Sequence, residues 1–258
     1  MRCAVVGHVE WVEFARVPNV PGPGEIVHAD RIWEEPAGGG AVVARQLARL
    51  AGRCELFTAL GDDELGHAAE RRLAALGIDV HVQRGGQTRR AWTHVDRDGE
   101  RTITVLGDKL LPHGPLPLEG YDLVFFVSGR PEALRDARSA RFLAATLREL
   151  PTLREGGVPL ELLVGSAADP GEQDDGSLTA ATVVVTEGAR GGTVNGERYE
   201  PAPAPPVVDT YGAGDSFAAA LSFALARGDS TGEALAFAAR AGASVLGGAG
   251  PYASQLFI

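Results

Sequence analysis

One segment of the chain combines residue types suited to phosphoryl transfer. Residues 209 to 215 read Asp-Thr-Tyr-Gly-Ala-Gly-Asp, and an alanine-rich stretch of helical character follows directly. The amides of Gly212, Ala213 and Gly214 can point at one anion, and the helix N-terminus adds about half a positive charge there. A carboxylate beside bound negative charge is costly, so we expect Asp215 to have a chemical task. We predict that Asp215 removes a proton from an acceptor hydroxyl while the three amides hold the phosphoryl group.

These residues need a scaffold, and the chain alternates apolar runs with helical patterns. Alternation of this kind predicts a mostly parallel sheet with helices on both faces. Asp63 can cap the helix that Gly77 ends. The apolar runs of strand length are Cys3 to Val6, Leu56 to Leu60, Leu123 to Val127, Leu160 to Val164 and Val183 to Thr186. The helical patterns are Gly40 to Leu50, Glu64 to Leu76, Pro131 to about Leu150, Ala213 to Arg227 and Thr231 to Leu246.

Two stretches break this alternation. Residues 9 to 33 place prolines among short apolar runs, and residues 88 to 106 alternate apolar with polar side chains. The second stretch contains Asp98-Gly99, a strong hairpin signal. We predict that segments at about 9–35 and 88–106 form a small antiparallel sheet projecting from a single domain of residues 1–258. Exposed edges and aromatic surface on such a sheet favour a homodimer formed through it.

Composition limits the classes of function. The chain has 258 residues, of which 45% are hydrophobic, and a formal net charge of -10. This acidity argues against nucleic-acid binding, which needs a basic surface. No apolar run reaches the ~18 residues of a membrane span, and the N-terminus reads as a short strand rather than a signal peptide. Cys3 and Cys54 are the only cysteines, which fits a reducing, cytoplasmic location without a zinc cluster.

At this point the chain resembles a known family, the PfkB or ribokinase-like carbohydrate kinases. Residues 209 to 217, Asp-Thr-Tyr-Gly-Ala-Gly-Asp-Ser-Phe, are similar to that family's C-terminal signature. The resemblance implies a three-layer α/β/α sandwich with a small β lid. It also implies that Asp215 is the catalytic base and that Gly212 to Gly214 form the anion hole. Asp209, which could instead only cap the turn, would lie near a monovalent cation such as K⁺ found in some members.

Further segments follow the order of that family. Ala37-Gly38-Gly39-Gly40-Ala41 resembles the N-terminal glycine motif that faces the sugar. Glycines there would let the backbone approach a hydroxyl-rich ligand closely, although a plain strand-to-helix turn is the structural alternative. Leu60-Gly61-Asp62-Asp63-Glu64-Leu65-Gly66 resembles a structural part of the same signature, where Asp63 is interpreted as a helix cap rather than a catalyst. Residues 96 to 102 look like the family's lid hairpin.

Two more segments resemble the nucleotide side of the family. Asp169-Pro170-Gly171-Glu172 is similar to an Asn-x-x-Glu motif that arranges magnesium and the phosphates of ATP. Magnesium prefers few carboxylates together with water and phosphate oxygens, so Asp169 and Glu172 suit it; an acidic surface loop is the alternative. Residues 186 to 192, Thr-Glu-Gly-Ala-Arg-Gly-Gly, resemble the nucleotide turn. Its cofactor-binding residues would be Thr186, Gly188, Arg190 and Gly191, and Arg190 could equally lie free on the surface.

The chain departs from the family pattern at three places. Glu10 stands where the family usually places an aspartate that holds sugar hydroxyls. Ala41, Val42, Val43 and Ala44 occupy the stretch where an asparagine normally follows the glycine motif. Only residues 173 to 181 separate the acidic motif from the next strand, so the nucleotide side is short. The first two departures affect the expected identity of the acceptor, and the third affects the expected contacts with ATP.

The sequence therefore predicts an ATP- and Mg²⁺-dependent kinase acting on a hydroxyl of a sugar or sugar-like molecule. Glu10 and the backbone of Gly38, Gly39 and Gly40 would orient the acceptor. A nucleoside kinase of the same fold is the first alternative, since an apolar wall at Val42 and Val43 could suit a base. A noncatalytic ligand-binding or regulatory protein is the second, favoured by the missing asparagine and disfavoured by the intact Asp215. A dinucleotide-binding enzyme is disfavoured because the first strand lacks a Gly-x-Gly-x-x-Gly turn.

Overall fold

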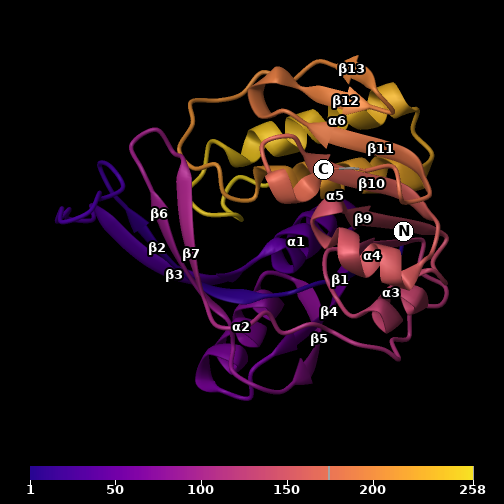
Figure 1. Cartoon of the computed structure of the whole chain (residues 1–258), viewed down its shortest axis with the longest axis horizontal. Coiled ribbons are helices and arrows are strands. Elements are labelled where there is room, and N and C mark those ends of the chain that lie inside the picture. Colours follow the sequence, from indigo (N-terminus) through magenta and orange to yellow (C-terminus); the bar gives the residue numbers. More distant parts are fainter. Residues whose placement is uncertain (174, 258) are drawn as a thin grey trace.

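The computed structural model describes residues 1–173 and 175–257, and within them one large sheet forms the body of the molecule (Figure 1). Its strand order is β13-β12-β11-β10-β9-β8-β1-β4-β5. The strands from β5 to β11 run parallel, and β12 and β13 join antiparallel at one edge. The strands are β1 Cys3–Val6, β4 Cys54–Leu60, β5 Ile78–Arg84, β8 Leu123–Phe126, β9 Phe142–Thr146, β10 Leu160–Ser166, β11 Ala180–Thr186, β12 Gly192–Val194 and β13 Glu197–Tyr199.

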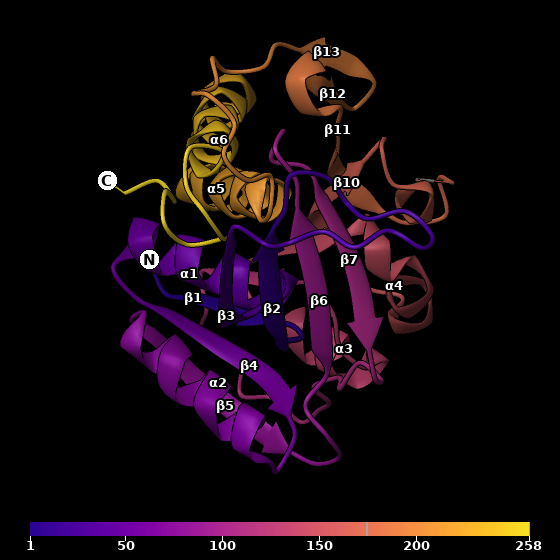
Figure 2. The same cartoon turned by 90° about the vertical axis from the view of Figure 1, so that its left-hand side faces the viewer.

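Helices cover both faces of this sheet, which confirms the three-layer α/β/α prediction. Side chains of β1 alternate between two hydrophobic clusters: Cys3 and Val5 face one side, and Ala4 and Val6 face the other. Figure 2 shows α1, α5 and α6 on one side and α3 and α4 on the other. The helices are α1 Gly39–Ala51, α2 Glu64–Ala75, α3 Pro131–Ala137, α4 Leu150–Gly156, α5 Ala213–Arg227 and α6 Thr231–Val245, with short 3-10 turns η1 Leu147–Glu149, η2 Pro170–Glu172 and η3 Gly188–Arg190.

A second, four-stranded sheet forms the lid, in the order β3-β2-β6-β7. It consists of β2 Glu10–Arg16, β3 Arg31–Ala37, β6 Arg90–Val95 and β7 Arg101–Leu106. Each hairpin is antiparallel, while the inner strands β2 and β6 pair parallel. The lid projects from the body in Figure 1, as the two irregular sequence stretches predicted.

One predicted element is wrong. The stretch from Pro131 to about Leu150 is not a single helix, because α3 ends at Ala137 and β9 follows at Phe142–Thr146. The sequence of β9, Phe-Leu-Ala-Ala-Thr, has the alanines of a helix, yet it lies in the middle of the sheet. Ala144 pairs with Phe125 of β8 and Leu162 of β10, and both alanines of the strand are buried. The small side chains leave room for packing on both faces, so tertiary context overrides helix propensity here.

Local signals explain several helix ends. The Asp63 carboxylate accepts a hydrogen bond from the Gly66 N–H at 2.8 Å, which confirms its role as the cap of α2. Ser230 and Glu233 form a reciprocal capping box at the start of α6. In the described part of the chain, none of these helices has the length and apolarity that crossing a bilayer requires.

Candidate active site

The N-terminus of α5 carries the predicted catalytic segment. Gly212 precedes the helix with φ +85°, a left-handed conformation that lets the chain turn sharply into the first helical residue, Ala213. Gly214 is exposed and Asp215 is half-buried in the same turn. Burial raises the pKa of the Asp215 carboxyl, and the positive charges of Arg101 and Arg148 oppose that shift.

The glycine motif of residues 38 to 40 lies directly against this turn. A Cβ placed on Gly39 would come within 3.2 Å of Asp215 Oδ1 and 2.8 Å of Val127 Cγ1, so only glycine fits there without displacing its neighbours. The Gly38 N–H also donates to the Tyr211 hydroxyl at 3.3 Å. The fold therefore brings the two glycine-rich motifs together although they are far apart in the sequence. Both begin helices, α1 and α5, that pack against each other.

Glu10, at the start of β2, lies on the same side of the site. Its carboxylate is 3.8 Å from His8 Nε2 and 3.2 Å from Arg89 Nε, and its side chain is only 11% exposed. Burial raises the pKa of Glu10, and Arg89 and Lys109 act against that shift. A Cβ on Gly38 would meet the Glu10 Cγ at 3.0 Å, so the predicted acceptor residues form one contiguous surface.

His8 is largely enclosed beside Glu10, with its side chain 11% exposed, and stays neutral. Burial, together with the nearby charges of Lys109, Arg89 and Arg148, lowers the pKa of His8 to about 3. Its Nδ1 lies 2.9 Å from the Ser128 hydroxyl, whose oxygen also accepts the His8 N–H. A neutral imidazole in this position can serve as a hydrogen-bonding group for an acceptor but not as a cation.

The acidic motif and the predicted nucleotide turn lie side by side at the carboxyl ends of β10 and β11. Ser166 of β10 pairs with Thr186 of β11, and the Ala167 N–H donates to the Thr186 carbonyl at 2.9 Å. The carboxyl edge of a parallel sheet is where ligands of α/β proteins usually bind. Gly188 and Gly191 adopt positive φ values in the turn. Arg190 is 76% exposed and pairs with Glu187 at 3.4 Å.

Arg148, in η1 just after β9, bridges the acidic motif. Its Nε donates to Glu172 Oε1 at 2.9 Å, and its Nη2 pairs with Asp169 Oδ2. Asp169 also accepts the Gly171 N–H, so it caps the turn that presents Glu172. No three acidic, histidine or cysteine side chains converge into a metal cage within residues 1–173 and 175–257. Magnesium needs only one or two carboxylates with water and phosphate oxygens, so this acidic pair fits it once Arg148 shares or yields those oxygens.

Asp209 holds two backbone segments together. It is 1% exposed; Oδ1 accepts the Tyr211 N–H and Oδ2 accepts the Gly250 N–H, each at 2.8 Å. These bonds join the C-terminal loop to the turn before α5. They agree with the alternative interpretation of Asp209, in which its carboxylate only caps this turn. Burial raises the pKa of Asp209 despite these bonds.

The structure thus assembles the predicted residues into two neighbouring groups. The acceptor group contains Asp215, Glu10 and the glycines at 38–40, and the second group contains the acidic motif and the 186–191 turn. Sequence reasoning missed the cations around them: Arg89, Lys109, Arg101 and Arg148. Lys109, which pairs with Glu149 at 2.8 Å, had one available signal, since it is the only lysine of the chain. Arg148 had none, because the strand before it was read as helix.

Comparisons with known proteins agree with this arrangement. A family model described as "pfkB family carbohydrate kinase" matches residues 1–124 and 163–256. An ATP-dependent ribose-1-phosphate kinase of Halopiger xanaduensis is 31% identical over 252 residues, covering 85% of this chain and 83% of the relative. Aminoimidazole riboside kinase of Salmonella typhimurium is 28% identical over 256 residues, covering 82% of this chain and 80% of the relative.

Solved structures show the same fold. Ribokinase from Thermotoga maritima superposes with a TM-score of 0.79 at 21% identity, covering 100% of this chain and 96% of that one. A nucleoside kinase from Methanocaldococcus jannaschii gives a TM-score of 0.77 at 18% identity, covering 100% and 95%. The arrangement of sheet, helices and lid is therefore shared across nearly the whole length of these chains.

Proposed function

Because this chain belongs to the pfkB family of carbohydrate kinases, we propose that it uses ATP to phosphorylate a hydroxyl on a sugar or sugar-like small molecule. The observation that carries this proposal is that Asp215 Oδ1 lies 3.2 Å from the position that a Cβ on Gly39 would occupy. A carboxylate at a helix N-terminus, facing a glycine surface, can reach the hydroxyl of an acceptor that lies on that surface. Family membership also favours an enzyme over a noncatalytic protein on this scaffold.

The chain's own residues divide the work on the acceptor side. Asp215 takes the proton of the attacking hydroxyl, while the amides of Gly212, Ala213 and Gly214 hold the transferred group. Glu10 and the backbone of the glycines at 38–40 orient the acceptor. The lid sheet covers this side and limits the access of water.

The second group of residues suits the donor. Thr186, Gly188, Arg190 and Gly191 would lie against the nucleotide, and Asp169 with Glu172 would hold Mg²⁺ through water or phosphate oxygens. When bound, ATP supplies the phosphoryl group and Mg²⁺ neutralises its charge. Asp209 remains the residue nearest to a proposed K⁺ site, with both carboxylate oxygens already accepting backbone N–H groups.

A nucleoside is the second candidate acceptor, and the relative that carries aminoimidazole riboside kinase in its name favours it. The apolar wall that first suggested a base is less available than expected, because Val42 and Val43 are buried in the core. A Cβ on Gly212 would meet Val42 Cγ1 at 3.0 Å, so this side chain mainly packs α1 against the catalytic turn.

The test is ATP consumption with a panel of sugars, sugar phosphates and nucleosides. Asp215→Asn should lower kcat by roughly 10²- to 10⁴-fold, the usual contribution of a general base. Asp229→Asn is the matched control, since Asp229 follows the opposite end of α5 and pairs only with Arg227 among its ion-pair partners in the described residues. Turnover by Asp215→Asn close to that of the control would exclude the proposed base. Preference for adenosine or inosine over ribose and fructose would select the nucleoside alternative.

A further inference from the structure

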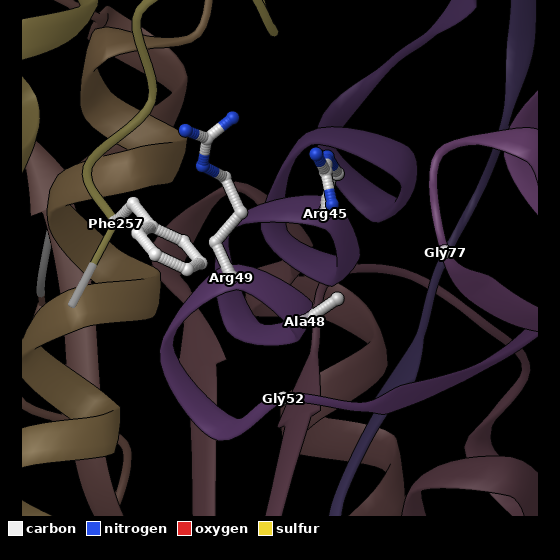
Figure 3. A pocket seen from close by; sticks show the side chains of 6 residues that line it. All are labelled: Arg45, Ala48, Arg49, Gly52, Gly77 and Phe257. Atoms are coloured by element: carbon white, nitrogen blue, oxygen red, sulfur yellow. The ribbon is translucent and has the colours of Figure 1, made fainter.

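A pocket of about 450 Å³ lies away from the two groups described above. It is formed by the last turns of α1, the loop that follows them, the end of α2 and the C-terminal segment. Successive residues of a helix rise by roughly 1.5 Å, so the pocket at Ala48 to Gly52 lies on the order of 15 Å from Gly39 along α1. Its lining residues are Arg45, Ala48, Arg49, Gly52, Gly77 and Phe257 (Figure 3).

Two arginines in this pocket have no ion-pair partner among residues 1–173 and 175–257. Arg45 and Arg49 are one helical turn apart on α1, and Figure 3 shows both side chains at the pocket. The Nε atoms of both are buried without a hydrogen-bond partner in the part of the chain that the structure describes. Burial lowers the pKa of Arg45, and the Arg49 guanidinium lowers it further. Two partly buried cations one turn apart, with no ion-pair partner in the described residues, are unusual in a chain of net charge -10.

The pocket leaves space for a ligand beside these cations. A Cβ on Gly52 would meet no atom within 4 Å, and a Cβ on Gly77 would meet only Arg45 Nη1, at 3.8 Å. On the other side, the Phe257 ring lies 5.7 Å from the Arg49 guanidinium carbon and restrains that side chain. The open volume is thus bounded by Gly52, Gly77 and the Phe257 ring, and the guanidinium groups of the two arginines line it as well.

We propose that this pocket binds a small phosphorylated anion between Arg45 and Arg49. A guanidinium presents a planar fork of donors that matches the oxygens of a phosphate group. A dianion beside the outer guanidinium nitrogens of both side chains would reduce the repulsion between the two cations, which lowers the pKa of Arg45. This site is separate from the catalytic residues, so the proposal does not depend on the acceptor or donor assignments made above.

The experiment follows the backbone amide signals of Gly52 and Gly77 by NMR while inorganic phosphate is added to the whole protein. These signals report on the pocket itself, whereas phosphate can also bind at the catalytic anion hole. We expect saturable shifts with phosphate, and none with chloride at the same ionic strength. In Arg45→Gln/Arg49→Gln the apparent Kd should rise by roughly tenfold or more, since hydrogen bonds to charged groups are lost.

Arg53→Gln provides the matched control, because Arg53 lies just beyond α1, is exposed and already pairs with Asp79. Its shifts should equal those of the wild type. An Arg45→Lys/Arg49→Lys variant keeps the charges and should bind phosphate with intermediate affinity. Absence of saturable shifts in the wild type, or unchanged binding by the glutamine variant in a folded state, would overturn the site. Equal shifts with acetate would overturn the assignment to phosphorylated ligands.

Discussion

Asp215, the proposed general base, is a residue at which activity and stability are expected to conflict. Burial raises its pKa above the ordinary value of 3.8, so the folded protein binds this proton more tightly than the unfolded chain does. The stability gained from the protonated group is fully present at low pH and is lost as the pH rises through the folded-state pKa. At neutral pH the ionised carboxylate therefore destabilises the fold.

From this sign we predict that Asp215→Asn raises the melting temperature at neutral pH while it abolishes most turnover. The gain should shrink as the pH falls below the raised pKa, since the wild-type carboxyl is then neutral as well. Thermal unfolding of both proteins across pH 4 to 8 measures this difference. A variant that is less stable than the wild type throughout that range would show that the carboxylate stabilises the fold instead.

Arg148 is the second residue whose role can be tested singly. It contacts both Asp169 and Glu172, so it would compete with Mg²⁺ for the carboxylate oxygens of the proposed magnesium site. We predict that Arg148→Met lowers the Mg²⁺ concentration needed for half-maximal ATP turnover by several-fold, because a competing cation is removed. Arg154→Met is the control, since Arg154 pairs with Asp175 outside this motif. An unchanged or higher Mg²⁺ requirement in Arg148→Met would contradict the shared site.

Among the elements, the hairpin between β6 and β7 contacts the segment that holds the proposed general base. The Gly99 carbonyl accepts two hydrogen bonds from Thr210, one from its N–H at 3.0 Å and one from its side-chain hydroxyl at 3.1 Å. Arg101 of β7 donates to the Thr210 carbonyl at 3.0 Å, and its charge lowers the pKa of Asp215. The tip of the lid is thus bonded to Thr210, two residues before Gly212, in the turn before α5. The lid can position this turn as well as cover the acceptor.

This coupling predicts the effect of Arg101→Met. Loss of the bond should lower kcat/KM by roughly tenfold, the contribution of a hydrogen bond to a charged donor. Loss of the charge should raise the pKa of Asp215, so the acid limb of the kcat profile should move to higher pH. The control is Arg97→Met on the same hairpin, because Arg97 bonds the Pro18 carbonyl instead. An acid limb that stays in place would limit Arg101 to a structural role.

The sequence predicted the elements wherever local chemistry and tertiary packing agree. Asp63 caps α2 as expected, and Asp98-Gly99 forms the lid turn. It failed at Phe142–Thr146, where alanines that favour a helix are held in a central strand by β8 and β10. That error also hid Arg148, because its place in the site depends on the strand that precedes it. The glycine motifs could be recognised from their spacing in the sequence. The arginines and the lysine around them could not, because these residues come close to the site only in the folded structure.

At the scale of the whole molecule, the lid sheet ends in an exposed edge strand that pairs with a neighbour on one side only in the described residues. Strand β7 is the last strand of the lid sheet, and all its residues are exposed. Ile103 and Val105 pair with Thr93 and Ala91, which are buried, so these two apolar side chains continue the buried face of the lid. An edge of this kind is completed most simply by a strand of another copy.

We therefore predict that the protein is a homodimer formed through the lid. Light scattering at micromolar concentration should give twice the 26.9 kDa mass of the chain. Ile103→Lys/Val105→Lys should give the monomer mass, because two buried charges would oppose the new sheet edge. Ile26→Lys is the control: Ile26 is 88% exposed but lies in the loop between β2 and β3. A monomeric wild type, or a dimer that survives the double substitution, would remove the lid as the interface.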